Sequence, residues 1–329
     1  KVGLVSCFLL VVPSRGVVGL NFAARFFKVD LSCVHWMYLH TVVPNVHFDK
    51  ITCSTPWSEA RFKFLTLKNN SEKMSDTVKL ILEGKEIELP VITGSENEKA
   101  IDISKLRDTT GYVTLDTGYK NTGATKSAIT FLDGEKGILH YRGYPIEQLA
   151  EKCDYLDVSY LLMHGELPDQ AQKTVYLKSI ASHSLLHDQL NNIFGGFRRD
   201  AHPMAVMVGV VGSMSAFYFD NMDINDPNHR QISAQRLIAK IPTIAAWSYT
   251  YNLGLPFVYP KNEYDFGTNF LHMLFSRPYK EYEPNPIISK AFEKILILHA
   301  DHEQNASTST VRLVGSTGAN PYACIAAGI

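Results

Sequence analysis

The sequence predicts a mainly α-helical protein with a small β region ahead of the helices. Beyond residue 145, apolar residues recur at the i, i+3, i+4, i+7 spacing that is typical of helices. Prolines stand at or near the expected helix starts, where the missing N–H costs nothing: Pro168, Pro203, Pro227, Pro242 and Pro286. Strands do not alternate with helices there, which argues against a parallel α/β architecture.

Composition excludes several classes of protein. The 329 residues are 45% hydrophobic and 20% charged, so two or three domains with sizeable cores are expected. Lys+Arg is 32 against Asp+Glu 33, which leaves no basic excess to bind nucleic acid or an anionic membrane. No apolar run reaches the roughly 18 residues of a membrane-spanning helix. The five scattered cysteines form no disulfide framework, which favours a reducing, cytoplasmic setting.

Residues 1–73 differ from the rest of the chain. They carry nine Lys/Arg and four Asp/Glu, a net charge of +5, so −6 falls on residues 74–329. Their apolar residues follow neither a helical nor a strand period. We interpret this segment as a non-native upstream extension with Met74 as the true start. A targeting leader and a genuine domain remain as alternatives.

Two β-hairpins are expected before the helices. The first pairs residues 78–82 with 86–89 around a turn at Gly84. The second pairs residues 129–132 with 138–141 around the polar run Asp133-Gly134-Glu135-Lys136-Gly137.

From Pro145 onward the pattern predicts helices. Ile146, Leu149 and Cys153 share one helical face. The nearly charge-free residues 204–219 predict a buried helix in which glycines allow close approach. Further helices are expected at 155–164, 169–194, 203–219, 227–241, 242–253, 267–275 and 286–303, and one opens at Asn320-Pro321.

The segment 295–312, ILILHADHEQNASTSTVR, carries the most informative pattern. At about 100° per residue, one helical face holds Ile288, Ala291, Ile295 and Leu298, then His299, His302, Asn305 and Ser309. The same projection turns four charged residues away: Glu293, Lys294, Asp301 and Glu303. An inward face that changes from apolar to hydrogen-bonding is therefore predicted.

Three interpretations of this polar face remain open. The two histidines could satisfy backbone groups at a helix end. They could bind a metal ion, although two ligands are too few for zinc and we expect no metal. They could instead line a pocket that donates hydrogen bonds to an anionic or carbonyl-bearing substrate.

Four long motifs carry a family resemblance: LHADHEQNASTSTVR, FRRDAHPMAVM, GLPFVYP and LDGEKGILHYRGYPIEQLA. The sequence from Met74 to Ile329 resembles citrate synthases of the Gram-negative, NADH-sensitive, hexameric type. The resemblance implies a small N-terminal β-rich domain over residues 74–125. It also implies part of the large α-helical citrate synthase domain over residues 126–329, cut before the rest of the active site.

The resemblance implies the chemistry of the first step of the tricarboxylic acid cycle. Acetyl-CoA, oxaloacetate and water would give citrate and CoA, with acetyl-CoA as co-substrate and no covalently bound cofactor. His302 matches an oxaloacetate-binding histidine, with Asn305 behind it. None of the family's proton-transfer residues is present, so this chain is expected to be an inactive fragment that ends inside a core helix. The alternatives are a 2-methylcitrate synthase, or a non-catalytic helical fragment or oligomerisation module.

The same resemblance implies regulation and self-association. An allosteric NADH pocket would use His183, Ser184, Tyr218, Arg236 and Lys240. Two positions depart from the pattern, because Ser182 stands where this type has Arg and Tyr279 where it has a reactive Cys. The complete protein would form a dimer or hexamer. On residue pattern alone, the basic and histidine pairs in this region are typical of solvated helix faces.

Overall fold

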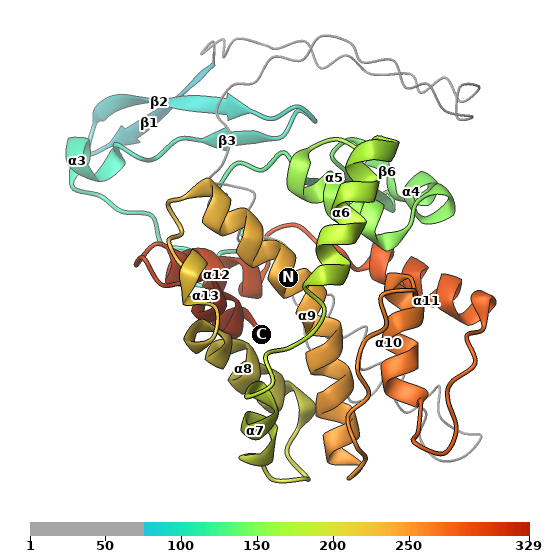
Figure 1. Cartoon of the computed structure of the whole chain (residues 1–329). Helices are drawn as coiled ribbons and strands as arrows, with labels where there is room; N and C mark the ends of the chain where they lie inside the picture. The colour runs from blue at the N-terminus through green and yellow to red at the C-terminus, as the bar shows by residue number, and fades with distance from the viewer. Residues whose placement is uncertain (1–75) are drawn as a thin grey trace. The chain divides into compact units, whose positions relative to one another are not determined.

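The computed structural model describes residues 76–329. The expected start at Met74, and the extension, leader or domain expected over residues 1–73, lie outside the described residues. The described part divides into two compact units, residues 76–126 and residues 127–329. Each unit is described by itself below and can be followed in Figure 1.

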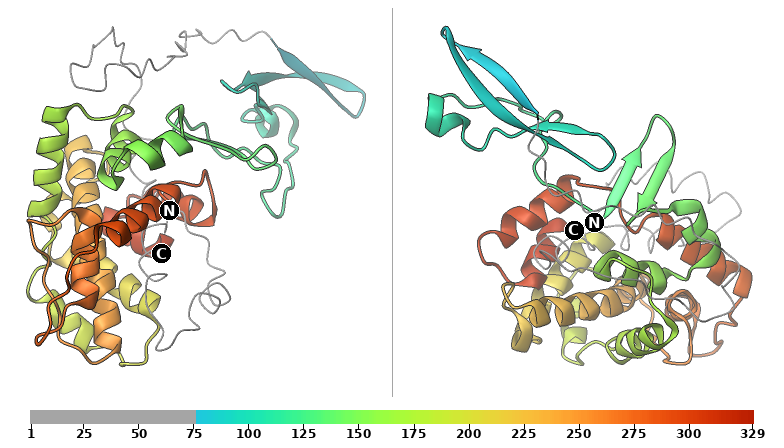
Figure 2. Two further views of the ribbon diagram at one scale, coloured as in Figure 1. Left: turned by 90° about the vertical axis from the view of Figure 1, so that its right-hand side faces the viewer. Right: turned by 90° about the horizontal axis from the view of Figure 1, so that it is seen from above.

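The first unit is built on an antiparallel sheet of three strands in the order β1-β2-β3. The elements are β1 (Thr77–Leu82), β2 (Lys85–Thr93), β3 (Lys99–Ile101) and the short helix α3 (Leu106–Thr110). Leu82 pairs with Lys85, and the two turn residues Glu83 and Gly84 have φ of +50° and +81°. A two-residue turn of this hand needs positive φ, which Gly84 adopts without strain. The first expected hairpin is confirmed, and Figure 2 shows it in blue-green.

The second unit begins with another antiparallel sheet, β4 (Thr130–Asp133), β5 (Ile138–Tyr141) and β6 (Tyr144–Pro145). Thr130 faces Tyr141 at the open end of the β4–β5 hairpin. Asp133 closes the turn, since its carboxylate accepts hydrogen bonds from the backbone N–H groups of Glu135 and Lys136. The second expected hairpin is thereby confirmed.

Helices make up the rest of the second unit, as the predicted fold class requires. In chain order they are α4 (Ile146–Lys152), α5 (Tyr155–His164), α6 (Gln170–Ser182), α7 (Leu190–Gly195), α8 (Pro203–Ser213), the 3₁₀ turns η1 (Met214–Ala216) and η2 (Phe219–Asn221), α9 (Pro227–Asn252), α10 (Phe266–Phe275), α11 (Pro286–Leu298), α12 (Ala306–Gly315) and α13 (Pro321–Gly328). Side-chain oxygens cap the N-termini of α6, α9, α10, α11, α12 and α13 through Asp or Asn.

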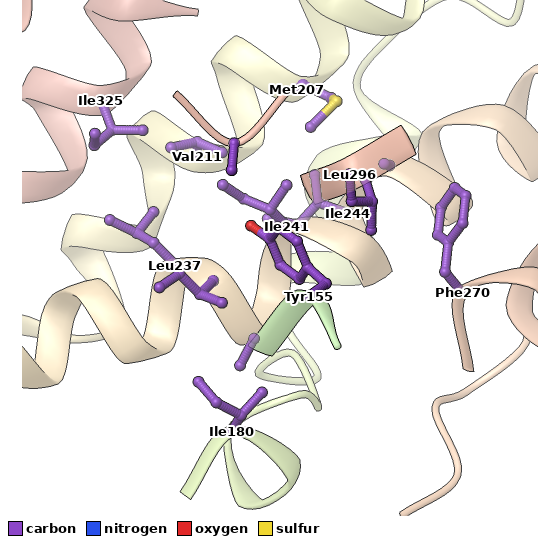
Figure 3. Packing of buried hydrophobic residues seen from close by; sticks show 14 of the residues in the cluster. Tyr155, Ile180, Met207, Val211, Leu237, Ile241, Ile244, Phe270, Leu296 and Ile325 are labelled. Carbon is purple, nitrogen blue, oxygen red and sulfur yellow. The ribbon is translucent and has the colours of Figure 1, made fainter. Parts of the chain in front are cut away.

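The hydrophobic core of this unit surrounds α9, the long helix that contacts α6, α8, α10 and α13. Figure 3 shows Leu237, Ile241 and Ile244 of α9 meeting side chains from several other helices. Trp247, also on α9, is 1% exposed and stacks on Phe257 with the ring centroids 4.6 Å apart. A single apolar cluster therefore joins helices that are far apart in the sequence.

The helix expected over residues 169–194 is wrong in its middle, where α6 stops at Ser182 and α7 starts at Leu190. Side chains of α9 take the backbone carbonyls that an unbroken helix would use internally. Lys240 Nζ donates to the carbonyls of His183 and Leu185 at 2.7 and 2.5 Å. Tertiary hydrogen bonds therefore override a helical pattern that the local sequence supports.

Pro242 does not start a new helix, contrary to the prediction, because α9 runs through it from Pro227 to Asn252. A proline inside a helix removes one hydrogen bond and costs about 3 kcal/mol. Every residue from Leu237 to Ser248 is buried, so packing of both halves against the core offsets that cost.

The helix expected over residues 203–219 is shorter, since α8 ends at Ser213 and continues as the 3₁₀ turn η1. Its burial is confirmed at Val206, Met207, Val210 and Val211. A Cβ placed on Gly209 would lie 2.5 Å from Phe197 Cζ, so the expected close approach is confirmed there.

Candidate functional site

The helix expected over residues 286–303 ends five residues early. His299 is the C-cap of α11, with φ −109° and ψ 9°. Its Nδ1 lies 2.7 Å from the carbonyl oxygen of Ile295, to which a protonated Nδ1 donates. The first of the three interpretations, a histidine that satisfies a backbone group at a helix end, is therefore confirmed for His299.

The predicted inward face of α11 is also wrong. The buried residues are Ser289, Phe292, Leu296 and Ile297, whereas Ile288 and Leu298 are each 47% exposed. The helix is apolar on two faces, and the one chosen from the sequence is not the one that packs on the core. Asp301, expected to point away, is 1% exposed.

His302 lies in the loop between α11 and α12, not on a helix. Its side chain is exposed, and no hydrogen bond to its imidazole is present within residues 76–329. Asn305 follows as the N-cap of α12, where its Oδ1 accepts from the N–H of Thr308 at 3.0 Å. Ser309, expected to face inward, is exposed, with Gln304 donating to its hydroxyl at 3.1 Å.

The residues on either side of His302 are bonded to the β4–β5 hairpin. The Tyr141 hydroxyl donates to the carbonyl of Asp301 at 2.9 Å and accepts from the Asp301 N–H at 3.1 Å. The Asp301 carboxylate accepts from the hydroxyl of Thr130. The Glu303 carboxylate accepts from the N–H of Leu132 at 3.1 Å. Sequence reasoning missed these partners because 160 to 171 residues separate the bonded pairs.

A second group of expected site residues meets at the N-terminal half of α9. The Arg236 guanidinium and the Lys240 ammonium lie 5.1 and 4.9 Å from the centre of the Tyr218 ring. Arg236 also binds both carboxylate oxygens of Asp220, at 2.9 and 3.0 Å. Asp220 was not among the residues that the sequence singled out. Both cations lie within cation–π distance of one aromatic ring, although Lys240 is only 3% exposed.

His183 and Ser184 join this group through their backbone. Both sit where α6 ends, and their carbonyls accept from Lys240 and Thr243 at 2.7 and 3.0 Å. Burial, with a smaller contribution from the charge of Arg236, lowers the pKa of Lys240 to about 8. The structure thus brings together all five residues expected around the NADH pocket, with Lys240 already bonded to the chain.

The two positions that depart from the NADH-sensitive pattern differ in their surroundings. Ser182 is the last residue of α6, and its hydroxyl donates to the carbonyl of Ser179 at 2.8 Å. Tyr279 is 86% exposed and lines a cavity of about 360 Å³ within the segment 275–283.

Two further features bear on the kind of site. Among residues 76–329, no three His, Cys, Asp or Glu side chains are grouped so that they could hold a metal ion. In the same part of the chain, no helix combines the length and apolarity needed to cross a membrane.

The family of the citrate synthase C-terminal domain matches residues 118–329, which include both groups of residues described above. The chain belongs to the citrate synthase family. Its mainly α-helical structure agrees with that assignment.

The structure is similar to solved citrate synthases, which are longer than the present chain covers. The enzyme from Pyrobaculum aerophilum is 30% identical over 77% of this chain and 58% of its own, with a TM-score of 0.59. The enzyme from Thermotoga maritima is 27% identical over 65% and 55%, with a TM-score of 0.56. The present chain therefore spans a little over half the length of these citrate synthases.

A third solved structure is the citrate synthase of Thermoplasma acidophilum in a ternary complex with carboxymethyl coenzyme A and oxaloacetate. It is 24% identical over 65% of this chain and 55% of its own, with a TM-score of 0.60. At that identity, the likeness concerns the fold.

Proposed function

We propose that the chain carries the oxaloacetate-binding part of a citrate synthase, which condenses acetyl-CoA with oxaloacetate. The observation that carries this proposal is the exposed imidazole of His302, which stands between two bonded neighbours in a segment that the family matches. The complex of the Thermoplasma relative with a CoA analogue and oxaloacetate supports the substrate class.

In this proposal His302 donates a hydrogen bond to an oxygen of oxaloacetate. The imidazole is accessible to a ligand without first breaking a bond within the described residues. Asn305 contributes to the proposed site as the N-cap of α12. The first backbone N–H groups of that helix follow His302 within a few residues. A hydrogen bond from such a donor to a charged ligand is worth roughly 1.5–3 kcal/mol, or about 10- to 150-fold in affinity.

Nuclear magnetic resonance of the imidazole protons tests this role even when binding is weak. Adding oxaloacetate should shift the His302 resonances, and His302→Gln should weaken binding by about 10- to 150-fold. His299→Gln is the comparison, because His299 bonds Ile295 and should affect helix stability more than affinity. A normal affinity in His302→Gln with a loss in His299→Gln would mean that the wrong histidine was assigned.

We also propose that the 329-residue polypeptide by itself does not catalyse citrate formation. The resemblance assigns none of the chain's residues to the family's proton-abstracting Asp or enol-stabilising His. Loss of such a set removes many orders of magnitude of rate. A thiol assay for CoA release checks this with acetyl-CoA and, for the 2-methylcitrate alternative, with propionyl-CoA. Citrate formation at a normal rate would contradict it.

The residues at the N-terminal half of α9 are proposed as an NADH-binding surface. The cations on Tyr218 support binding of an anionic, aromatic ligand. Titration followed by NADH fluorescence tests it, and Arg236→Gln should lower the affinity. Asp220→Asn should raise it, since Asp220 competes for the same guanidinium. Self-association as a dimer or hexamer and a cytoplasmic setting stay predictions of the resemblance.

A further inference from the structure

The loop that carries His302 is held on both sides of the imidazole. Before it, the Asp301 backbone is bonded twice to the Tyr141 hydroxyl, and its carboxylate accepts from Thr130. After it, Glu303 Oε1 accepts from the N–H of Leu132. All three hairpin residues belong to β4 or β5, so one rigid element fixes both neighbours of His302.

The loop also contains a backbone conformation that needs support. Glu303 has φ +57°, in the left-handed region that residues other than glycine avoid. Its N–H donates to the Asp301 carboxylate at 3.2 Å, and its own carboxylate is bonded to β4. Strained residues persist only where surrounding contacts over-determine them, and they concentrate at functional sites.

The hairpin is in turn anchored to the helical core. Arg142 follows β5 directly, and one of its guanidinium nitrogens donates to the carbonyl of Leu162 in α5 at 3.0 Å. Its backbone N–H donates to Ile129 at 2.7 Å. Tyr141 itself is 0% exposed, and its hydroxyl also lies 3.2 Å from the carbonyl of Ile297 in α11. The hydroxyl is therefore fixed relative to both α5 and α11.

We propose that Tyr141 is a positioning residue: through Asp301 it fixes the position of the His302 imidazole. It does not touch the ligand, and its hydroxyl fixes the backbone on which His302 is carried. The inference rests on the proposed role of His302 in binding oxaloacetate. Thr130 and Leu132 complete the support from the same hairpin.

The test compares two buried tyrosines. Tyr141→Phe removes only the hydroxyl that holds Asp301. Tyr176→Phe is the matched control, because Tyr176 is 4% exposed and its hydroxyl is bonded to Ser159 at 2.8 Å, with no bond to the loop. Both variants of the full chain are measured by amide hydrogen exchange and by the His302 imidazole resonances during oxaloacetate titration.

We expect Tyr141→Phe to raise exchange at the Asp301 amide at least tenfold and to weaken oxaloacetate binding about tenfold. Tyr176→Phe should leave the Asp301 exchange rate and the oxaloacetate affinity at wild-type values. This difference should hold even if both variants have the same melting temperature. Wild-type exchange and affinity in Tyr141→Phe would overturn the proposal, as would an equal affinity loss in Tyr176→Phe. If Tyr141→Phe does not fold, Thr130→Val removes the hydroxyl bonded to the Asp301 carboxylate with little change of shape, and a wild-type oxaloacetate affinity in that variant would overturn the proposal.

Failure of the proposed function would look different. A wild-type chain whose His302 resonances do not respond to oxaloacetate would contradict the substrate. In that case the exchange at Asp301 and the free-state shift of the His302 ring still decide whether Tyr141 positions the loop.

Discussion

Glu293 of α11 is a partly buried carboxyl group, and its removal should stabilise the protein at neutral and alkaline pH. Burial raises its pKa to about 7, and the carboxylates of Asp154 and Asp265 add to that effect. These two residues are the N-caps of α5 and α10, and Lys173 of α6 is bonded to Asp154. The Glu293 carboxyl accepts from the Gly267 N–H at 3.3 Å, a bond that Gln can retain.

The magnitude follows from the two pKa values. The folded state favours the protonated form, so its stabilisation is fully present below the unfolded value of about 4.5 and is lost as pH rises through about 7. One pKa unit corresponds to about 1.4 kcal/mol, which gives a loss of roughly 2–3 kcal/mol between pH 5 and pH 8. Glu293→Gln abolishes this titration and should therefore exceed the wild type in stability at pH 8.

Urea denaturation of both proteins at pH 5 and pH 8, followed by far-UV circular dichroism, measures the difference. Subtracting the wild-type change from that of the variant cancels the other titrating groups. Glu151→Gln is the control, because Glu151 is exposed on α4 and should shift neither value. If Glu293→Gln and the wild type lose stability equally between the two pH values, the surroundings of Glu293 do not disfavour its charge and the reasoning fails.

Three further predictions concern single contacts. Asn305→Ala removes the acceptor for the Thr308 N–H and should lower the unfolding free energy by about 1 kcal/mol in urea titrations, with no change contradicting the cap. Gly209→Ala places a Cβ against Phe197 and should cost about 1–3 kcal/mol in thermal melts, whereas an unchanged melt would mean that the ring moves freely. Lys240 has a pKa of about 8, so NADH affinity should fall by up to about tenfold between pH 7 and pH 9, and a constant affinity would exclude its charge from binding.

The elements that the sequence predicts well are those with local signals. The first hairpin follows from the turn at Gly84, and α5 starts at the Asp154 capping box and stops at Gly165, whose φ is +95°. Asn320 with Pro321 starts α13 in the same way. In each case the deciding hydrogen bonds join residues within about four positions, so the pattern in the sequence contains them.

Elements decided by distant partners could not be predicted in this way. The break between α6 and α7 depends on Lys240 and Thr243, more than 50 residues away. The continuity of α9 through Pro242 depends on the unbroken burial of residues 237–248 on both sides of the proline. Local helix propensity has less influence than tertiary contacts at such places. Those contacts bind the backbone groups that a helix would pair, or offset the cost of a proline inside a helix.

Periodicity indicates that α11 is amphipathic, but it cannot say which of two apolar faces packs inward. Ile288 and Leu298 form a regular stripe and stay half exposed, while Phe292 and Leu296 are 2% and 1% exposed. The buried face is marked instead by a close approach, because a Cβ on Gly267 of α10 would lie 2.8 Å from Glu293 Cγ. That contact turns Glu293 inward. The expected positions of His302 and Asp301 were wrong for a second reason, because α11 ends at Leu298 and a helical projection no longer applies beyond it. In the structure Asp301 is the buried residue, and His302 is the one left accessible to a ligand.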